Sequence, residues 1–178
     1  TTTVANITTG SNNVISGEKL ALTGTGTFAA NSVKTNVLSL SSGAKATFAG
    51  DNALKQLDLA ANSAVSINSG ATLTLDDIGA DGSSLFTGSG TLALNKSGMT
   101  VNSKLSDLGG LSVLHSATLS GTAQVGSITV ANGATLTVDA AAQANTVSIA
   151  SGAGLIQNAD MTAGTVSFGS NGKLTVNG

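Results

Sequence analysis

Pairs of apolar residues separated by one small or polar residue recur along the whole chain. The first members of these pairs are spaced by roughly 19 residues, with a shorter interval between Leu57 and Leu73. The first members are Leu20, Leu38, Leu57, Leu73, Leu92, Leu111, Ile128, Val147 and Val166. The second members are Leu22, Leu40, Leu59, Leu75, Leu94, Val113, Val130, Ile149 and Phe168. Because alternate residues of a strand point to opposite faces, this pattern predicts nine strands, each with one buried face.

A turn and a second strand follow most of these predicted strands. The turns contain Gly or Asn, which adopt positive φ readily, at Gly43, Asn62, Gly98, Gly133, Gly152 and Gly172. The second strand begins about eight residues after the first, as at residues 136–138. A weaker third side carries smaller or mixed residues, namely Leu54, Leu108, Val125, Ala144 and Ala163. Two or three short strands with tight corners in one repeat predict a coil of a parallel β-solenoid.

The predicted fold class is therefore all-β: a single-domain parallel β-solenoid (β-helix) of about nine coils with a roughly 19-residue repeat. At about 4.8 Å per coil, the rod would be on the order of 40 Å long. The solenoid is expected over residues 20–178, after an irregular coil or extended donor-like arm at residues 1–19. A loop insertion is expected near residues 76–90, and the coil boundary near Leu73 is left open.

Two other folds are alternatives to the solenoid. Asn132-Gly133 and Asn171-Gly172 have the composition of hairpin turns, so an antiparallel sandwich is the main alternative. A helical array is disfavoured by the period-two strands and by the density of Gly, Ser and Thr.

Composition and charge exclude several classes of function. The 178 residues include 23 Gly and no Pro, Cys, Trp or Tyr, and all seven basic residues are Lys. The absence of Cys excludes disulfide scaffolds, Cys-based zinc sites and thiol catalysis. A net charge of −2 without a basic run argues against nucleic-acid binding. No apolar run approaches the roughly 18 residues of a membrane helix, so no membrane span is expected.

The coil ITVANGATLTV, at Ile128 to Val138, illustrates a pattern that extends from Leu20 to Val176. In this pattern, in its Ser/Thr/Asn/Gly-rich exterior and in its lack of Cys, the chain resembles secreted bacterial β-solenoid surface proteins. These are autotransporter passenger domains and related repeat adhesins or extracellular filament subunits. The resemblance implies an extracellular location at the bacterial cell surface. It is specific for architecture rather than for function, because such solenoids include adhesins, scaffolds and enzymes.

Few residues offer catalytic or metal-binding chemistry. His115 is the only histidine, and no motif supplies it with a nucleophile and an orienting acid, so we expect no enzymatic activity and no catalytic residue. Asp76, Asp77 and Asp81 in LDDIGADGSS form the one acidic cluster, and carboxylates of a Gly-rich loop are candidate ligands for Ca²⁺. Their order matches neither the EF-hand loop nor the nonapeptide of calcium-binding β-rolls, and a solvated loop is the other interpretation.

Two binding functions are alternatives to a structural role. Outward threonines, as at Thr135 and Thr137, are typical of ice-binding solenoids, but Gly154 and Lys173 interrupt the expected array. An adhesin segment that binds a glycan or a host surface is the second alternative. The chain has four Phe and no Trp or Tyr, which leaves few aromatic platforms for sugar rings.

The ends of the predicted solenoid indicate self-association. The last repeat, FGSNGKLTVNG, is followed by no polar cap, and an uncapped coil exposes apolar rows and strand edges. Strand addition between the last coil of one copy and the N-terminal segment of the next is therefore expected. The residues expected at this interface are Val4, Ile7, Val14, Ile15, Leu174 and Val176.

Head-to-tail contacts of this kind do not close, so they build a filament. The sequence thus predicts a non-enzymatic structural subunit of a self-assembling extracellular bacterial filament that supports cell cohesion, biofilm or surface attachment. Its partners would be further copies of itself and cell-surface or matrix components. Because the chain starts without Met or a signal-like segment, a processed product or a fragment of a longer solenoid is the other interpretation of its ends.

Overall fold

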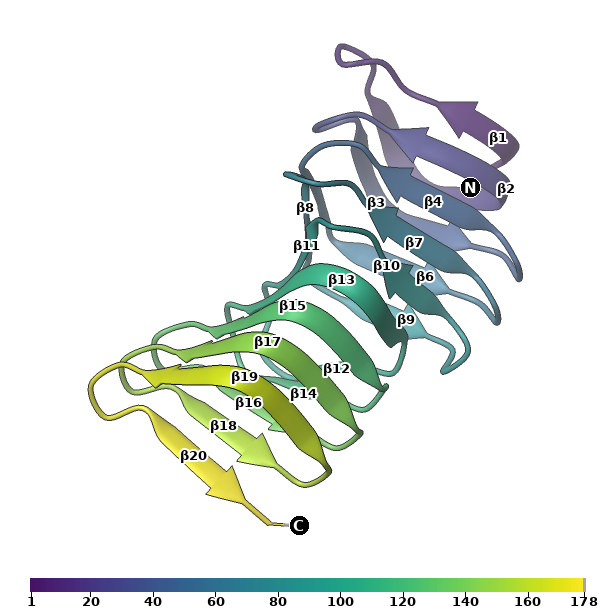
Figure 1. The fold of residues 1–178 in the computed structure, drawn as a ribbon. Coiled ribbons are helices and arrows are strands. Elements are labelled where there is room, and N and C mark those ends of the chain that lie inside the picture. Colours follow the sequence, from purple (N-terminus) through teal and green to yellow (C-terminus); the bar gives the residue numbers. More distant parts are fainter. Residues whose placement is uncertain (178) are drawn as a thin grey trace.

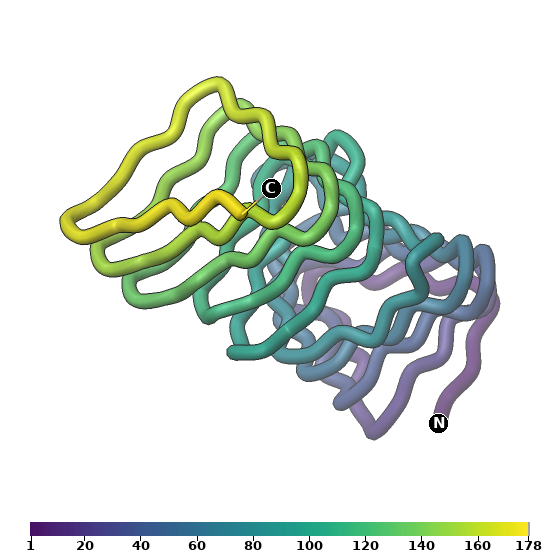
Figure 2. Tube along the Cα trace, turned by 90° about the horizontal axis from the view of Figure 1, so that it is seen from below, coloured from purple at the N-terminus to yellow at the C-terminus, as the bar shows by residue number. Residues whose placement is uncertain are grey.

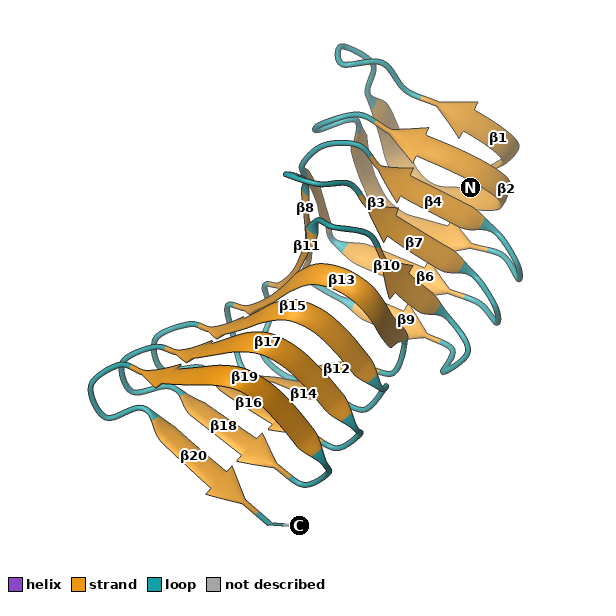
Figure 3. Ribbon diagram, viewed as in Figure 1, coloured by secondary structure: helices purple, strands orange, loops and turns teal. Residues whose placement is uncertain are grey.

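The computed structural model describes residues 1–177, which contain strands and turns but no helix (Figures 1 and 3). The chain winds into coils, and Figure 2 shows the successive turns as a stack of loops from the N-terminal to the C-terminal end. Within the described range there is accordingly no helix long and apolar enough to cross a membrane.

Twenty strands are present in this range. They are β1 (Thr2–Thr8), β2 (Ile15–Phe28), β3 (Val33–Leu40), β4 (Lys45–Phe48), β5 (Asn52–Leu54), β6 (Gln56–Leu59), β7 (Ala64–Ile67), β8 (Thr72–Leu75), β9 (Ile78–Ala80), β10 (Leu85–Thr87), β11 (Thr91–Leu94), β12 (Met99–Val101), β13 (Lys104–Val113), β14 (Ala117–Leu119), β15 (Ala123–Val130), β16 (Thr135–Val138), β17 (Ala142–Ile149), β18 (Gly154–Gln157), β19 (Met161–Phe168) and β20 (Lys173–Val176).

Each coil contributes one segment to each of three sides, and equivalent segments of neighbouring coils lie parallel to one another. Side 1 contains residues 2–4, 20–22, 38–40, 57–59, 78–80, 99–101, 117–119, 136–138, 155–157 and 174–176. Side 2 contains residues 6–8, 25–28, 45–48, 64–67, 85–87, 104–105, 123–125, 142–144 and 161–163. Side 3 contains residues 15–17, 33–35, 52–54, 72–75, 91–94, 110–113, 127–130, 146–149 and 165–168.

The predicted fold class is confirmed. The structure is a single-domain parallel β-solenoid of about nine turns with roughly 19-residue spacing. The last coils are the most regular, since Val147 pairs with Val166 and Leu155 pairs with Leu174, both at the full repeat interval. Parallel pairing throughout the ladders excludes the antiparallel sandwich.

The nine predicted strands turn out to lie on two different sides. Leu38 and Leu57 pair with each other on side 1, whereas Leu73 pairs with Leu92 on side 3. Leu57 and Leu73 therefore belong to the same coil, which accounts for the short interval between them. The coil boundary that the sequence leaves open near Leu73 is a change of side rather than a change of coil.

The structure differs from the loop insertion expected near residues 76–90. Both β9 and β10 lie in this stretch, and they pair with β6 and β7 of the preceding coil. The extra residues lie earlier, in a corner between sides 2 and 3. Phe48 pairs with Ile67, and Asn52 pairs with Leu73, so residues 68–72 connect the paired positions in this coil, where the shorter segment 49–51 connects them in the preceding coil.

The corners use the left-handed region of backbone space at a fixed position. Gly133, Gly152 and Asn171 occupy this position in consecutive coils and have φ values of 72°, 66° and 59°. The sequence predicted Gly172 for the last of these corners, but the structure has the positive φ at Asn171. Asn tolerates this conformation better than most residues. The position in the repeat therefore determines which residue has the positive φ, even where a glycine is next to it.

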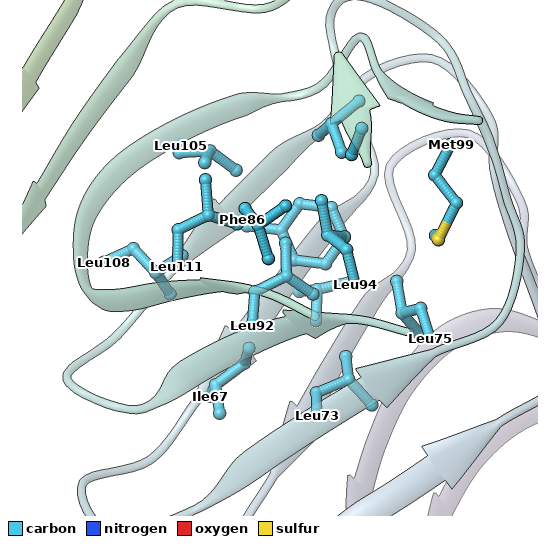
Figure 4. Packing of buried hydrophobic residues seen from close by; sticks show 14 of the residues in the cluster. Ile67, Leu73, Leu75, Phe86, Leu92, Leu94, Met99, Leu105, Leu108 and Leu111 are labelled. Atoms are coloured by element: carbon cyan, nitrogen blue, oxygen red, sulfur yellow. The ribbon is translucent and has the colours of Figure 1, made fainter. Parts of the chain in front are cut away.

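The core is a continuous column of apolar side chains inside the coils. Leu73 and Leu92 of side 3 lie in this interior with Ile67 and Phe86 of side 2 (Figure 4), and all four are fully buried. Burial of a large apolar side chain contributes about 1.5–3 kcal/mol to stability.

Aromatic packing on side 2 links two coils near the N-terminal end. Phe28 and Phe48 are paired in the ladder between β2 and β4, and their ring centroids lie 5.3 Å apart. Both side chains are completely buried.

Phe48→Ala is expected to lower the free energy of unfolding by about 3–5 kcal/mol, because it removes a buried ring and its contact with Phe28. Thr47→Ala, at the neighbouring outward position, is the matched control and is expected to change the free energy of unfolding by about 0.5 kcal/mol or less. Chemical denaturation followed by circular dichroism measures both. Equal effects of the two substitutions would contradict the assignment of Phe48 to the core.

Candidate functional site

The structure does not bring the three carboxylates of the predicted calcium cluster together. Asp76 and Asp77 lie between β8 and β9, at the corner where side 3 meets side 1, whereas Asp81 follows β9 at the next corner. Asp76 Oδ1 accepts a hydrogen bond from Asn95 Nδ2 at 2.8 Å, and Asp77 Oδ1 accepts one from the backbone N–H of Ile78 at 2.9 Å. Across residues 1–177, no group of three or more His, Cys, Asp or Glu side chains could hold a metal ion.

Asp81 instead closes a turn with Ser83. Its Oδ1 accepts hydrogen bonds from the Ser83 hydroxyl at 2.5 Å and from the Ser83 backbone N–H at 2.8 Å. These two donors stabilise the carboxylate and hold the pKa of Asp81 below its ordinary value. The Ser83 hydroxyl oxygen also accepts from the backbone N–H of Asn62 in the preceding coil at 3.0 Å, so the turn is tied to its neighbour.

His115 lies exposed in the corner between β13 and β14. It borders a cavity of about 260 Å³, whose other lining residues are Ser97, Leu114, Ser116, Asn132, Gly133 and Ala134. This lining contains no carboxylate that could orient the imidazole, so the arrangement offers no acid–base pair.

Polar side chains on several corners form ladders that run from coil to coil. Asn36 Nδ2 donates to Glu18 Oε2 at 2.8 Å, and Lys55 Nζ donates to Asn36 Oδ1 at 2.7 Å. Near the C-terminal end, Asn158 Nδ2 donates to Asp139 Oδ1 at 2.7 Å, and Asn177 Nδ2 donates to Asn158 Oδ1 at 2.8 Å. These residues hold neighbouring coils together rather than present groups to a ligand.

Two cavities on side 2 and at its corner with side 3 share Gln124 and Gln143. The first has a volume of about 410 Å³, and the second about 300 Å³. We call the two together the amide groove; its polar lining residues include Ser89, Lys104, Ser106, Asp107, Thr122, Gln124, Gln143, Asn145, Asp160 and Thr162. It crosses β13, β15, β17 and β19, the strands that continue from side 2 into side 3 (Figure 1).

Sequence reasoning missed the amide groove because no catalytic or metal motif marks it. The available signal was the recurrence of Gln at an interval of one repeat. Gln124 and Gln143 are direct ladder partners on consecutive coils, so their side chains emerge beside each other.

The outward threonines are arranged differently from the array considered in the sequence. Thr100, Thr118 and Thr137 are ladder partners in one row on side 1, and Thr137 is followed by Ile156 and then Thr175. In the N-terminal half of the same side, the equivalent positions carry Thr3, Ala21, Ser39, Asp58 and Gly79. Among the described residues, successive threonines therefore occur only in the C-terminal half, and Ile156 interrupts them once.

The residues predicted for a self-assembly interface lie at the two ends of the stack. Val4, Ile7 and Ile15 are half-buried and pack against the core, whereas Val14, Leu174 and Val176 are exposed. The structure adds Val166 and Phe168, which are also exposed. The repeat pattern could have identified these two residues as part of the interface, because they are the apolar pair of the last predicted strand on side 3.

Comparison of the chain with protein-family models, with curated proteins and with solved structures found no match.

Ser83→Ala is expected to raise the pKa of Asp81 toward its ordinary value, because the hydroxyl donor is lost. A depressed carboxyl pKa stabilises the fold above the pKa of the unfolded chain, and this contribution is lost as pH falls through the folded pKa. An NMR titration of the Asp81 carboxyl carbon measures the shift. Ser69→Ala, at an exposed turn position without a side-chain hydrogen bond, is the control, and an unchanged Asp81 pKa in Ser83→Ala would refute this explanation.

Proposed function

We propose that this chain is a non-enzymatic structural subunit that assembles head to tail into an extracellular bacterial filament. The observation that carries the proposal is the exposure of apolar side chains on the last described coil. Phe168 and Val176 are 49% and 55% exposed, whereas Ile149, the ladder partner of Phe168 one coil earlier, is 1% exposed. The difference arises because Ile149 is covered by a following coil and no described residue covers Phe168.

Four apolar side chains of the last coil share this exposure. They are Val166, Phe168, Leu174 and Val176. Covering each of them with another coil would contribute on the order of 1 kcal/mol, since about half of each side chain is already buried. Together with main-chain hydrogen bonds along the open edges of β19 and β20, this favours association of a solenoid coil with this end.

The first coil supplies a surface of matching character. β1 forms a parallel ladder with β2 on one edge only, and its other edge carries unpaired backbone groups among the described residues. Val4 and Ile7 lie on this coil and are partly exposed. A second copy that adds its β1 beside β20 would extend side 1 by strand addition.

Contact between the first described coil of one copy and the last described coil of the next leaves one of each free, so such contact continues without closing. This supports a filament rather than a dimer. Polar ladders such as Glu18–Asn36–Lys55 are consistent with a mechanical role. The Ser/Thr/Asn/Gly-rich exterior without Cys supports the extracellular, cell-surface location, as does the resemblance to secreted bacterial solenoids.

Phe168→Lys is expected to abolish assembly, because it would place a charge among the side chains that the next copy must cover. Ser167→Lys is the matched control: it adds the same charge at the adjacent outward position and should leave assembly intact. Light scattering over a concentration series, followed by negative-stain electron microscopy, distinguishes monomers from filaments.

Three results would overturn the proposal. They are a wild-type protein that stays monomeric at high concentration, a Phe168→Lys variant that assembles normally, and equal loss of assembly in both variants. Circular dichroism of each variant establishes that the solenoid itself is retained.

A further inference from the structure

The side chains of the amide groove are not paired with one another, in contrast to the polar ladders on the corners of the solenoid. Lys104, Asp107, Gln124, Gln143 and Asn145 make no side-chain hydrogen bond or ion pair with any described residue. Elsewhere, amides and carboxylates that meet on successive coils do pair, as Asn158 and Asp139 do at 2.7 Å. The groove therefore presents free donors and acceptors from several coils on one surface.

Two glycines that line the second cavity allow the backbones of neighbouring coils to approach closely. A Cβ at Gly109 would collide with the carbonyl oxygen of Ser89, and one at Gly126 would lie 2.5 Å from the carbonyl oxygen of Gly109. Neither position accepts a larger residue without a backbone shift, so backbone rather than side chains lines the second cavity at these two positions.

An unusual backbone conformation lies in the same place. Asp107 has a positive φ of 52°, and the ladder between β13 and β15 shifts register between Leu105 and Leu108. Asn and Asp adopt this conformation more readily than other non-glycine residues, and Asp107 contributes an unpaired carboxylate to the groove lining.

The charges and functional groups of the lining define the class of ligand. Lys104 is opposed by Asp107 and Asp160, so the groove has no strong preference for a polyanion or a polycation. Glutamine and asparagine amides each offer both donors and acceptors, and the hydroxyls of Thr122 and Thr162 add more of both. This set is complementary to sugar hydroxyls, which also donate and accept.

We propose that the amide groove binds a neutral oligosaccharide that lies along the solenoid axis. Gln124 and Gln143, on successive coils about 4.8 Å apart, would contact neighbouring parts of the glycan. Ala141, which is exposed and lines the larger cavity, offers a small apolar surface to the C–H groups of the sugar. The lining contains no aromatic platform, so the affinity is low for a single oligosaccharide and increases when a filament presents many grooves. The groove itself does not depend on assembly.

The test uses the wild-type protein at a concentration where it is monomeric and three defined probes. Cellohexaose and maltohexaose are neutral linear hexasaccharides, and hexagalacturonate is an anionic one. Two-dimensional ¹⁵N–¹H NMR follows the side-chain NH₂ groups of Gln124, Gln143 and Asn145 during titration. The expected result is a saturable shift of these groups with at least one neutral probe and a weaker response to the anionic probe.

The double substitution Gln124→Ala with Gln143→Ala is expected to weaken binding at least about tenfold, because two side-chain hydrogen bonds are lost. Gln157→Ala removes a glutamine on side 1, away from the groove, and should leave binding unchanged. The proposal is overturned if neither neutral probe shifts the groove amides, if the anionic probe binds more tightly, or if both variants weaken binding equally.

Discussion

Every inward-facing apolar residue of this solenoid depends on the adjacent coils for its burial, and the rest of the structure follows from this constraint. Val147 and Val166 occupy equivalent positions on consecutive coils, yet their exposed fractions are 1% and 39%. The side chains are identical, so the difference is due to the coil that follows Val147. The stability of such a structure is approximately the sum of the intrinsic stability of each coil and the interaction energy between neighbouring coils. The terminal coils have one neighbour instead of two and are therefore stabilised least.

The fold could be predicted from the sequence because burial between adjacent coils requires apolar residues at a fixed interval along the chain. An apolar pair such as Ile128 and Val130 predicts a strand, and a corner glycine such as Gly133 predicts the turn that follows it. The same pattern could not assign each strand to a side of the solenoid, because Leu57 on side 1 and Leu73 on side 3 both begin an apolar pair of the same kind. Only the ladder partners distinguish them, and those depend on the length of every corner between them.

The candidate sites could be predicted less well than the fold. Asp76, Asp77 and Asp81 are close in sequence, but successive corners of a coil separate Asp81 from the other two. Conversely, Gln124 and Gln143 are one repeat apart in the sequence and adjacent in space. In a solenoid, residues that share a site recur at the interval of the repeat. Residues one repeat apart are therefore better predictors of a shared site than residues that are close together in the sequence. The exposure of Phe168 could not be predicted from residue type either. Phe168 is an ordinary member of the repeat, and its exposure depends on whether another coil covers it.

The two proposed activities use different parts of one architecture. Assembly depends on the apolar ends of the stack, where burial is incomplete, and glycan binding depends on a polar flank, where hydrogen-bonding groups are unpaired. A filament of such coils would repeat the flank at regular intervals, so mechanical cohesion and attachment to a polysaccharide matrix would be combined without a separate binding domain.

Hydrogen exchange measured coil by coil, in dilute and in concentrated protein, tests the central claim most directly. In dilute protein, amides of β19 and β20 should exchange faster than those of β15 and β16, because fewer neighbours protect the end of the stack. In concentrated protein, exchange at β1, β19 and β20 should slow while the middle coils are unaffected. Uniform exchange along the chain, or end coils whose exchange does not respond to concentration, would contradict the account.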